Sequence, residues 1–427
     1  MPDLAEREMR RNQALILTDY ISFGIGMSFL GPTTLLPSII RLLGGSPVAV
    51  GALGAIQSGA WLLPQLVIGR YVANRPLVKR WVVVPLAISR CCLGLIPLAL
   101  FLFALRAPDW AVGLILLAVL FFNINDALGS VPWFDLMAKA VPPERRGQVM
   151  GSAQAVASFL GIGAGLIVER VLARPNAFPS SYTLLTLAGA LICGICPIAL
   201  GLIREPAGAT NGPAQPAWGQ YLPRLATILR SDARFAWLTA LRWLTGLADM
   251  AAAFFVLYAT DRLGVPQAMV GLFISASVLG TMLCGVILGP LGDRKGNILI
   301  IQVLIGLRCI TPTLALLAPP AASLHPWVAP GMFILIFLFM GMTTTYMLGF
   351  YNYLLEIAPE SERMTYISLS NTLGGVLLIA PLFAGWLVQA TSYETLFLVA
   401  LALAALGLLL SLRGPARQRA EQVVAGV

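Results

Sequence analysis

Long apolar stretches recur from one end of this sequence to the other, and they restrict the fold more than any other feature. Each is about 20 residues long, which is enough for a helix to cross the roughly 30 Å hydrocarbon layer of a bilayer. Because the stretches are continuously apolar rather than alternating, they exclude a β-barrel. We predict an all-α membrane protein with twelve transmembrane helices, at residues 14–38, 49–71, 82–105, 111–137, 147–168, 182–203, 235–260, 268–290, 298–318, 328–355, 365–388 and 395–412.

The amino-acid composition supports a membrane protein. Charged residues make up 11% of the 427 residues and the mean hydropathy is +0.84, whereas about a quarter of the residues in a soluble globular domain are charged. The first residues, MPDLAEREMRRNQ, are charged and lead directly into the first apolar stretch. They lack the short apolar core and cleavage site of a signal peptide, so we expect no cleaved leader.

The formal net charge of +9 is explained by membrane topology rather than by a nucleic-acid partner. If the amino terminus lies in the cytoplasm, 20 lysines and arginines fall on the cytoplasmic side, 5 fall in outer loops and 3 fall inside helices. This asymmetry follows the positive-inside rule. We therefore expect a multi-pass protein of the cell inner (plasma) membrane, with both termini in the cytoplasm and no nucleic acid as a partner.

The cysteines and the single histidine give no sign of catalysis. All six cysteines fall within predicted helices, so no disulfide framework is implied. Cys193 and Cys196 form a CxxC motif, but on an apolar helix they are best interpreted as small buried hydrophobic residues. His325 stands alone in an outer loop and makes no metal or catalytic cluster. We expect no enzyme activity, no metal and no cofactor.

The second half of the sequence repeats features of the first at a nearly constant offset. The motif SRCC around Arg90 matches LRCI around Arg308, 218 residues later. VPPERRG at 141–147 matches APESERM at 358–364, and Arg146 and Arg363 are 217 residues apart. These matches predict two pseudo-symmetric six-helix bundles.

The repeat divides the chain into five segments. In the linker between the two bundles, residues 205–234, aromatic and aliphatic residues from Trp218 to Leu229 recur at helical spacing, with arginines between them. This pattern predicts an amphipathic helix on the inner membrane face, with a solvated linker helix as the alternative. The segments are a cytoplasmic amino-terminal segment (1–13), the two bundles (14–204 and 235–413), the linker (205–234) and a cytoplasmic tail (414–427).

One short loop, GPLGDRKGN, places three charges in a row between the eighth and ninth predicted helices. Gly292 and Gly296 permit a tight turn, and Arg294 suits the anionic inner leaflet. Asp293 can accept hydrogen bonds from a helix amino terminus and pair with Arg363, which would make an inner latch. The candidate gating residues are Gly289, Gly292, Asp293, Arg294, Gly296, Arg146 and Arg363.

Two six-helix halves, a linker and this loop together resemble the major facilitator superfamily of secondary transporters. The family's loop runs Gly-x-x-x-Asp/Gly-Arg-Lys/Arg-Gly-Arg/Lys, and the residues from Gly289 to Gly296 match it. Asn297 departs from the final basic position. The resemblance covers essentially the whole chain. It implies alternating access around a central cavity lined by helices 1, 4, 7 and 10.

Several ionisable residues lie within the predicted helices, where an ionised group costs about 2.5–3.5 kcal/mol near the bilayer centre. We interpret Asp126, Asp249 and Asp19 as candidate proton-coupling residues. Arg90 and Arg308 occupy matching positions in the two halves, so we interpret them as structural charges that are paired within each half.

Asp126 belongs to a polar stripe on the fourth predicted helix. Asn123, Asp126 and Ser130 stand at positions i, i+3 and i+7, which share one face of a helix. The alternative role for Asp126 is a structural ion pair with Arg90. The candidate substrate-binding residues combine polar groups with aromatic stacking surfaces, and they are Tyr20, Asn123, Ser130, Trp133, Arg242, Trp243, Tyr346 and Phe350.

These features predict a proton-coupled secondary transporter of a small organic solute. Membrane lipids, a small-molecule substrate and protons are the expected partners, and a monomer is the expected state. The chain lacks the arginine on helix 4 and the Gly-Pro pair on helix 5 that many proton antiporters of the superfamily carry, which argues against proton-driven drug export.

Three alternatives to this function stay open at the level of sequence. A uniporter or facilitator of the same fold would use the buried charges only for structure. A lipid flippase or scramblase would be expected to have an apolar cleft in place of the polar stripe at Asn123 and Asp126. A membrane sensor would be expected to carry an added soluble domain. The sequence determines neither the substrate nor the direction of transport.

Overall fold

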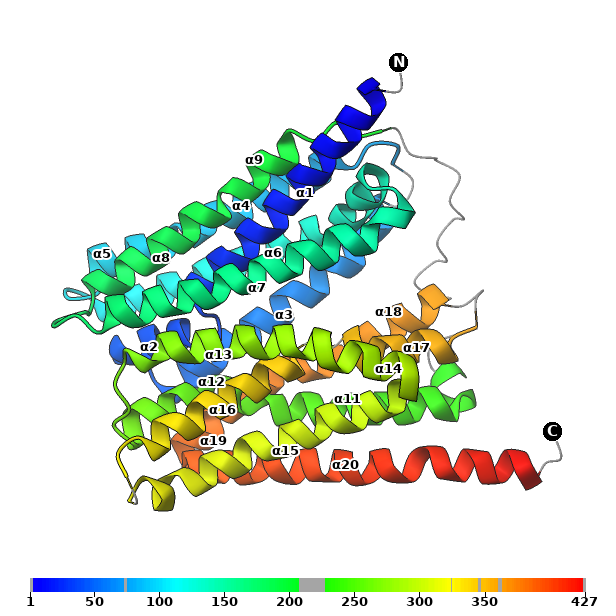
Figure 1. The fold of residues 1–427 in the computed structure, drawn as a ribbon. Helices are drawn as coiled ribbons and strands as arrows, with labels where there is room; N and C mark the ends of the chain where they lie inside the picture. Colours follow the sequence, from blue (N-terminus) through cyan, green and yellow to red (C-terminus); the bar gives the residue numbers. More distant parts are fainter. Residues whose placement is uncertain are drawn as a thin grey trace. The chain divides into compact units, whose positions relative to one another are not determined.

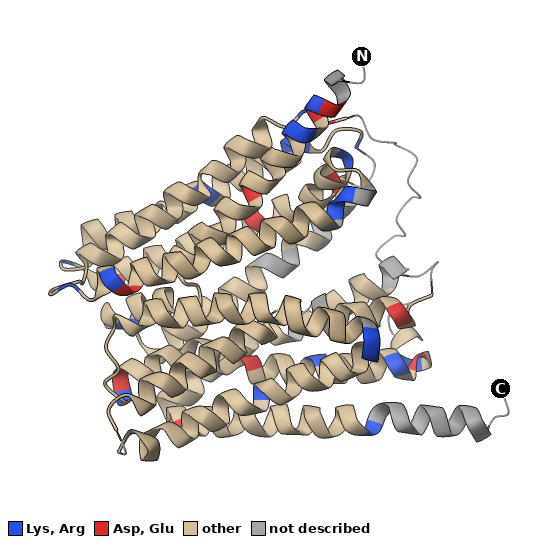
Figure 2. Cartoon of the chain, viewed as in Figure 1, with Lys and Arg blue, Asp and Glu red and all other residues tan. Residues whose placement is uncertain are grey.

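The computed structural model describes residues 3–72, 75–206, 227–323, 325–344, 347–359 and 363–424. In this part of the chain every regular element is a helix (Figure 1). Helices satisfy all their backbone hydrogen bonds internally, as the lipid interior requires. Charged residues gather near the helix ends, and few lie in the middle of the helices (Figure 2).

The helices match the apolar stretches of the sequence. Three shorter apolar helices, Pro47–Ala60, Val328–Thr343 and Leu377–Ala390, coincide with the second, tenth and eleventh predicted stretches. These three and the nine longer helices given next account for the twelve predicted spanning segments. The predicted all-α, twelve-helix, two-bundle membrane fold is therefore confirmed. The described residues contain nine helices that are long and apolar enough to cross a membrane: Glu6–Leu42, Lys79–Phe103, Pro108–Ala140, Gln148–Leu172, Ser180–Gly201, Ala233–Arg262, Met269–Gly292, Asn297–Ala322 and Tyr393–Arg413.

The first compact unit comprises Met1–Gln215 and Pro266–Val278. In it α6 packs against α3 and α4, and α1 packs against α7, α8 and α9. A buried cluster that includes Ile16, Val82 and Leu136 forms part of its core. Its helices are α1 (Asp3–Leu30), α2 (Leu35–Leu42), α3 (Pro47–Val72), α4 (Lys79–Leu93), α5 (Leu95–Phe103), α6 (Pro108–Ala140), α7 (Pro143–Leu172), α8 (Ser180–Cys193) and α9 (Ile195–Gly201).

The beginning of α13 (Met269–Leu283) belongs to the first unit because it contacts α7 at glycines. A Cβ atom on Gly271 would lie 2.4 Å from the carbonyl oxygen of Gly165, so the two backbones touch. Ser275 Oγ donates a hydrogen bond to the carbonyl oxygen of Ile162 at 2.9 Å. The units follow contacts rather than the sequence repeat, so the predicted segment boundaries stay a prediction.

Three predicted helices of the first unit are each divided in two. The first breaks at Gly31, whose φ of 51° is unfavourable for other residues. The third and sixth break at Gly94 and Gly194. Each of these two glycines is followed three residues later by a proline, which cannot donate the helical hydrogen bond to the residue four positions earlier.

The second compact unit comprises Pro216–Val265 and Leu279–Val427. Its core includes Phe235, Leu241, Ile305 and Phe350. Its α-helices are α11 (Ala233–Ala248), α12 (Ala252–Leu257), α14 (Gly289–Lys295), α15 (Asn297–Ala322), α16 (Val328–Thr343), α17 (Asn352–Ile357), α18 (Arg363–Gly374), α19 (Ala380–Ala390) and α20 (Tyr393–Val424), and the end of α13 also belongs to it.

Helical irregularities distinguish the second unit from the first. Segments of 3₁₀-helix lie at η1 (Asp249–Ala251) and η6 (Gly375–Ile379), and π-helical turns lie at η2 (Tyr258–Arg262), η3 (Cys284–Leu288) and η4 (Met347–Tyr351). The described helices of the first unit contain no such segment. Irregular turns inside long helices often mark functional positions.

The predicted linker is only partly described. Residues 207–226, which include most of the predicted amphipathic helix, lie outside the described residues. Residues 227–231 are helical, and Ile228 packs in the core of the second unit. The interfacial role of this helix stays a prediction.

Candidate functional site

A cavity of about 330 Å³ lies inside the first unit, between α1, α4 and α6. Residues four apart on an α-helix share one face, so Asp126 and Ser130 on α6, and Leu86 and Arg90 on α4, point to the same space. The cavity is lined by Asp19, Tyr20, Phe23, Leu86, Arg90, Asp126, Ser130, Trp133 and Phe134.

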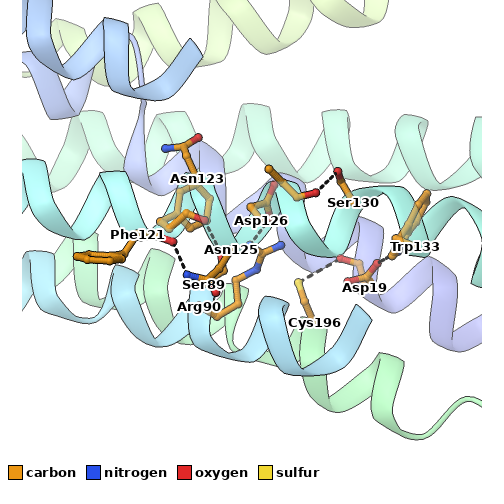
Figure 3. Close-up of polar contacts among 12 residues, drawn as sticks. Asp19, Ser89, Arg90, Phe121, Asn123, Asn125, Asp126, Ser130, Trp133 and Cys196 are labelled. Atoms are coloured by element: carbon orange, nitrogen blue, oxygen red, sulfur yellow. Dashed lines mark hydrogen bonds and ion pairs between the residues drawn. The ribbon is translucent and has the colours of Figure 1, made fainter. Parts of the chain in front are cut away.

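Arg90 and Asp126 form a buried ion pair beside this cavity. Arg90 Nη1 lies 2.5 Å from Asp126 Oδ1 and 2.9 Å from Ser89 Oγ (Figure 3). The side chains of Arg90 and Asp126 are 5% and 13% exposed. The guanidinium carbon of Arg90 lies 4.6 Å from the ring centroid of Phe23 and 5.4 Å from that of Phe122. Both the carboxylate and the aromatic faces stabilise the buried positive charge.

Asp19 is the second carboxylate on the cavity, and its surroundings differ. It is 5% exposed, and it accepts a hydrogen bond from Trp133 Nε1 at 2.7 Å (Figure 3). Cys196 Sγ lies 3.4 Å from the backbone carbonyl oxygen of Asp19. Among the described residues, no lysine or arginine lies within ion-pairing distance of Asp19. The cavity therefore carries one neutralised carboxylate and one without a cationic partner.

A second buried arginine lies in the second unit. Arg308 Nε and Nη2 donate to the two carboxylate oxygens of Asp249 at 2.8 and 3.0 Å, and Nη2 also donates to the carbonyl oxygen of Thr343 at 2.9 Å. Bidentate pairs of this kind are strong and geometrically specific. Asp249 begins η1 and Thr343 ends α16. Arg308 thus joins two points where helices lose their regular form.

The predicted substrate-binding residues fall into two groups. Tyr20, Ser130 and Trp133 line the cavity, while Asn123 donates to the carbonyl oxygen of Val119 at 2.8 Å on its own helix. Tyr346 lies outside the described residues.

The other three predicted residues lie in the second unit, where they bind neighbouring helices. Arg242 Nη1 donates to the carbonyl oxygen of Ser370 at 2.5 Å, and Trp243 Nε1 donates to that of Leu373 at 2.8 Å, so both connect α11 to α18. Phe350 is 1% exposed in the core. These contacts are structural, and a contact with substrate stays a prediction for each residue.

The predicted gating loop adopts a tight turn at its second glycine. Gly296 has a φ of 87°, and its amide donates to the carbonyl oxygen of Gly292 at 2.8 Å. Asn297, which departs from the family pattern, donates from Nδ2 to Glu356 Oε2 at 3.0 Å and so ties α15 to α17.

The predicted latch falls on side chains outside the described residues. The side chains of Asp293 and Arg363 lie outside the described residues, Gly289 begins α14, and Arg294 is exposed. Arg146 donates to the carbonyl oxygens of Val141 and Ala138 at 3.0 and 2.6 Å, which satisfies the end of α6.

Glu205, the first residue of the predicted linker, has a buried side chain. Its side chain is 3% exposed and accepts from the backbone amides of Val78 and Lys79 at 2.7 and 2.8 Å, at the start of α4. It also pairs with Lys139 at 3.1 Å. Carboxylates are stabilised at helix amino termini. In the sequence, the only indication of this role was the position of Glu205 directly after the sixth apolar stretch.

The chemistry available at the cavity is that of charge, hydrogen bonding and aromatic faces. The described residues contain no group of three or more His, Cys, Asp or Glu side chains arranged to hold a metal ion.

Comparison with known families gives a match over most of the chain. The family model described as Major Facilitator Superfamily matches residues 2–166 and 238–425. The matched ranges include α1, α4 and α6 around the cavity, and also the Asp249–Arg308 pair.

Individual relatives are more distant. Uncharacterized proteins of Mycobacterium bovis and Mycobacterium tuberculosis are 27% identical over 299 residues, which is 69% of this chain, and the match spans 57% of their length. A mutant of the nucleoside transporter NupG has a TM-score of 0.68 at 13% identity, covering 95% of this chain and 99% of that one.

Two further solved structures are similar. A bacterial homologue of the iron transporter ferroportin has a TM-score of 0.66 at 15% identity, covering 94% and 98% of the two chains. The xylose transporter XylE from E. coli has a TM-score of 0.65 at 13% identity, covering 95% and 96%. At such identities the likeness concerns the fold alone.

Proposed function

The chain belongs to the major facilitator superfamily, and we propose that it moves a small organic solute across the membrane by alternating access, coupled to protons through the cavity of the first unit. Its fold is that of the solved transporters. The names of these transporters concern nucleosides, xylose and iron, so the organic solute is proposed from the aromatic and hydrogen-bonding lining of the cavity. Cytoplasmic termini, an inner-membrane location and a monomeric state are part of the same proposal.

The observation that carries the proton coupling is the position of Asp19. An ionised carboxylate that is buried without a cationic partner is costly, and protonation removes that cost. Asp126 already has Arg90 at 2.5 Å, and Asp249 has Arg308. Of the three carboxylates that the sequence nominates, we therefore assign the transported proton to Asp19.

The groups around Asp19 determine how it titrates. Arg90 faces it from α4, Asp126 from α6, and Cys196 from α9, while Trp133 donates to it directly. Arg90 and Asp126 largely cancel each other as an ion pair. Gain or loss of a proton at Asp19 therefore changes the net charge of the cavity.

The test first identifies a solute that binds the protein and then measures its transport under a proton gradient. The unfolding temperature of the purified protein is measured against a panel of small organic solutes, and the solute that raises it most is used in proteoliposomes. We expect a pH gradient to drive its accumulation. Asp19→Asn should abolish this accumulation, whereas Asp19→Glu, which keeps an ionisable carboxylate, should retain it.

Matched variants identify the carboxylate that couples transport to protons. Asp109→Asn makes the same change at an exposed carboxylate on α6 and should behave like the wild type. If Asp19→Asn accumulates solute as well as the wild type, the role moves to Asp126 or Asp249, each tested by its own Asn variant. If the wild type equilibrates solute without responding to the gradient, the protein is a uniporter.

A further inference from the structure

The ionisable groups of the cavity leave one unmatched negative charge. Asp19, Asp126 and Arg90 line it, so with both carboxylates ionised the formal charge is two negative against one positive, or −1. The positive charge of Arg90 is neutralised by its ion pair with Asp126. An occupant that brings one positive charge to Asp19 would complete the balance in the same way as the proton in the proposed function, on which this inference rests.

The walls beside Asp19 are aromatic. Trp133 donates its indole N–H to the carboxylate, so the indole ring lies directly beside the charge. Tyr20 and Phe134 also line the cavity, and Phe134 packs edge-to-face on Trp133 with ring centroids 5.2 Å apart. Aromatic faces attract cations, tryptophan most strongly. Since Trp133 points its N–H edge at Asp19, a positively charged group would meet the carboxylate, and the apolar body attached to it would pack on the aromatic side chains of the cavity wall.

The polar neutral groups of the cavity are already engaged. Ser130 Oγ donates to the carbonyl oxygen of Ala127 at 2.9 Å, and the Tyr20 hydroxyl donates to Gln154 Oε1 at 2.7 Å. A highly hydroxylated neutral solute would thus find few free donors. An anion would have to compete with Asp126 for Arg90, which is also enclosed by two phenyl rings.

From this charge balance and these aromatic walls, we infer that the cavity selects a monovalent organic cation with an aromatic or other apolar body, and that Asp19 determines this selectivity. Asp126 has a different task, which is to neutralise Arg90 so that the arginine does not repel such a solute. The inference concerns the class of solute and is independent of the direction of transport.

Three biphenyl-like probes of similar size test the inference on the purified full-length chain: the cation 1-methyl-4-phenylpyridinium, the neutral biphenyl-4-carboxamide and the anion biphenyl-4-carboxylate. Isothermal titration calorimetry measures each affinity. We expect the wild type to bind the cation at least about tenfold more tightly than the other two probes. Asp19→Asn should remove this preference, while Asp19→Glu and the exposed-site control Asp109→Asn should keep it.

A double variant tests whether the preference for a positively charged probe can be reversed. Asp19→Asn combined with Asp126→Asn leaves Arg90 as the sole charge of the cavity, so the preference should pass to the carboxylate probe. Circular dichroism checks that each variant is folded. If the Asn variants unfold, the wild type carries the test, because protonation of Asp19 at low pH should weaken binding of the cation and leave binding of the neutral probe unchanged.

The inference is overturned if the wild type prefers the neutral or the anionic probe, if it binds none of the three, or if Asp19→Asn keeps the affinity for the cation. Each of these results leaves the proton-coupled transport of another solute intact. Conversely, a failure of gradient-driven accumulation in proteoliposomes overturns the proposed function, whichever probe binds.

Discussion

The carboxylate of Glu205 joins two helices of the first unit, α4 and α6, and its removal should be costly. It accepts hydrogen bonds from the backbone amides of Val78 and Lys79, and it pairs with Lys139 from the end of α6. The change Glu205→Ala leaves two backbone N–H groups at the start of α4 without their acceptor. It also removes one of the two carboxylates that Lys139 contacts, since Asp135 remains at 2.8 Å.

The magnitude follows from these contacts. A hydrogen bond to a charged group contributes about 1.5–3 kcal/mol, and the contributions of neighbouring bonds do not simply add. Lys139 keeps Asp135, so the loss of its pair with Glu205 adds less than the ~3–5 kcal/mol that a buried charge left without any partner costs. We expect Glu205→Ala to lower the free energy of unfolding by about 3–5 kcal/mol. Glu205→Gln keeps a neutral acceptor and should cost about 1.5–3 kcal/mol.

Hydrogen exchange measured by mass spectrometry localises the effect. Exchange in the peptide that begins at Val78 should be about a hundredfold faster in Glu205→Ala if about 3 kcal/mol of protection is lost. The control is Glu8→Ala, because the Glu8–Arg204 pair is about half exposed and should contribute about 0–1 kcal/mol. If Glu205→Ala exchanges and unfolds like the wild type, the carboxylate is not holding α4.

Two further predictions concern other contacts. Gly271→Ala should lower the unfolding temperature, because the new Cβ would lie 2.1 Å from the amide nitrogen of Glu169, whereas Gly285→Ala, at a position with open space, should not; equal unfolding temperatures would refute the close contact. Asp293→Asn should increase the labelling of a cysteine placed at Ser130 from the cytoplasmic side, in a background without the native cysteines, because a weakened latch favours the inward-open state. Unchanged labelling of a folded protein would mean that Asp293 is only a loop residue.

The sequence predicted the crossings of the membrane well because length and apolarity are local properties of a segment. The division of the third and sixth crossings was missed, although both contain a glycine three residues before Pro97 or Pro197. The 3₁₀ segment at Asp249 was not predictable in the same way. Its carboxylate is held by Arg308, 59 residues away, and such tertiary contacts have no local signal.

The candidate site was predictable where one helix supplies its residues. The spacing of Asp126 and Ser130 placed both on one face of α6, and the structure finds both on the cavity. The role of Asp19 was harder to predict, because a residue count along its own helix gives the depth of Asp19 in the membrane but not the side chains that surround it. It is the Trp133 side chain from α6 that binds the Asp19 carboxylate, and the two residues are 114 apart in the sequence.

The two buried arginines show what an internal repeat does and does not determine. Arg90 and Arg308 occupy matching sequence positions, and each forms an ion pair with a carboxylate of its own half. Their partners differ, since Arg90 binds a carboxylate on α6 whereas Arg308 binds one at the α11–η1 junction. The pair in the first unit lines a cavity, while Arg308 in the second unit fixes two irregular helix ends. A duplicated arginine thus keeps its burial and its need for a carboxylate, but the helix that supplies the carboxylate is free to change. For this reason we propose that solute recognition lies in the cavity beside the first arginine, at Asp19, and that the second arginine has a structural role.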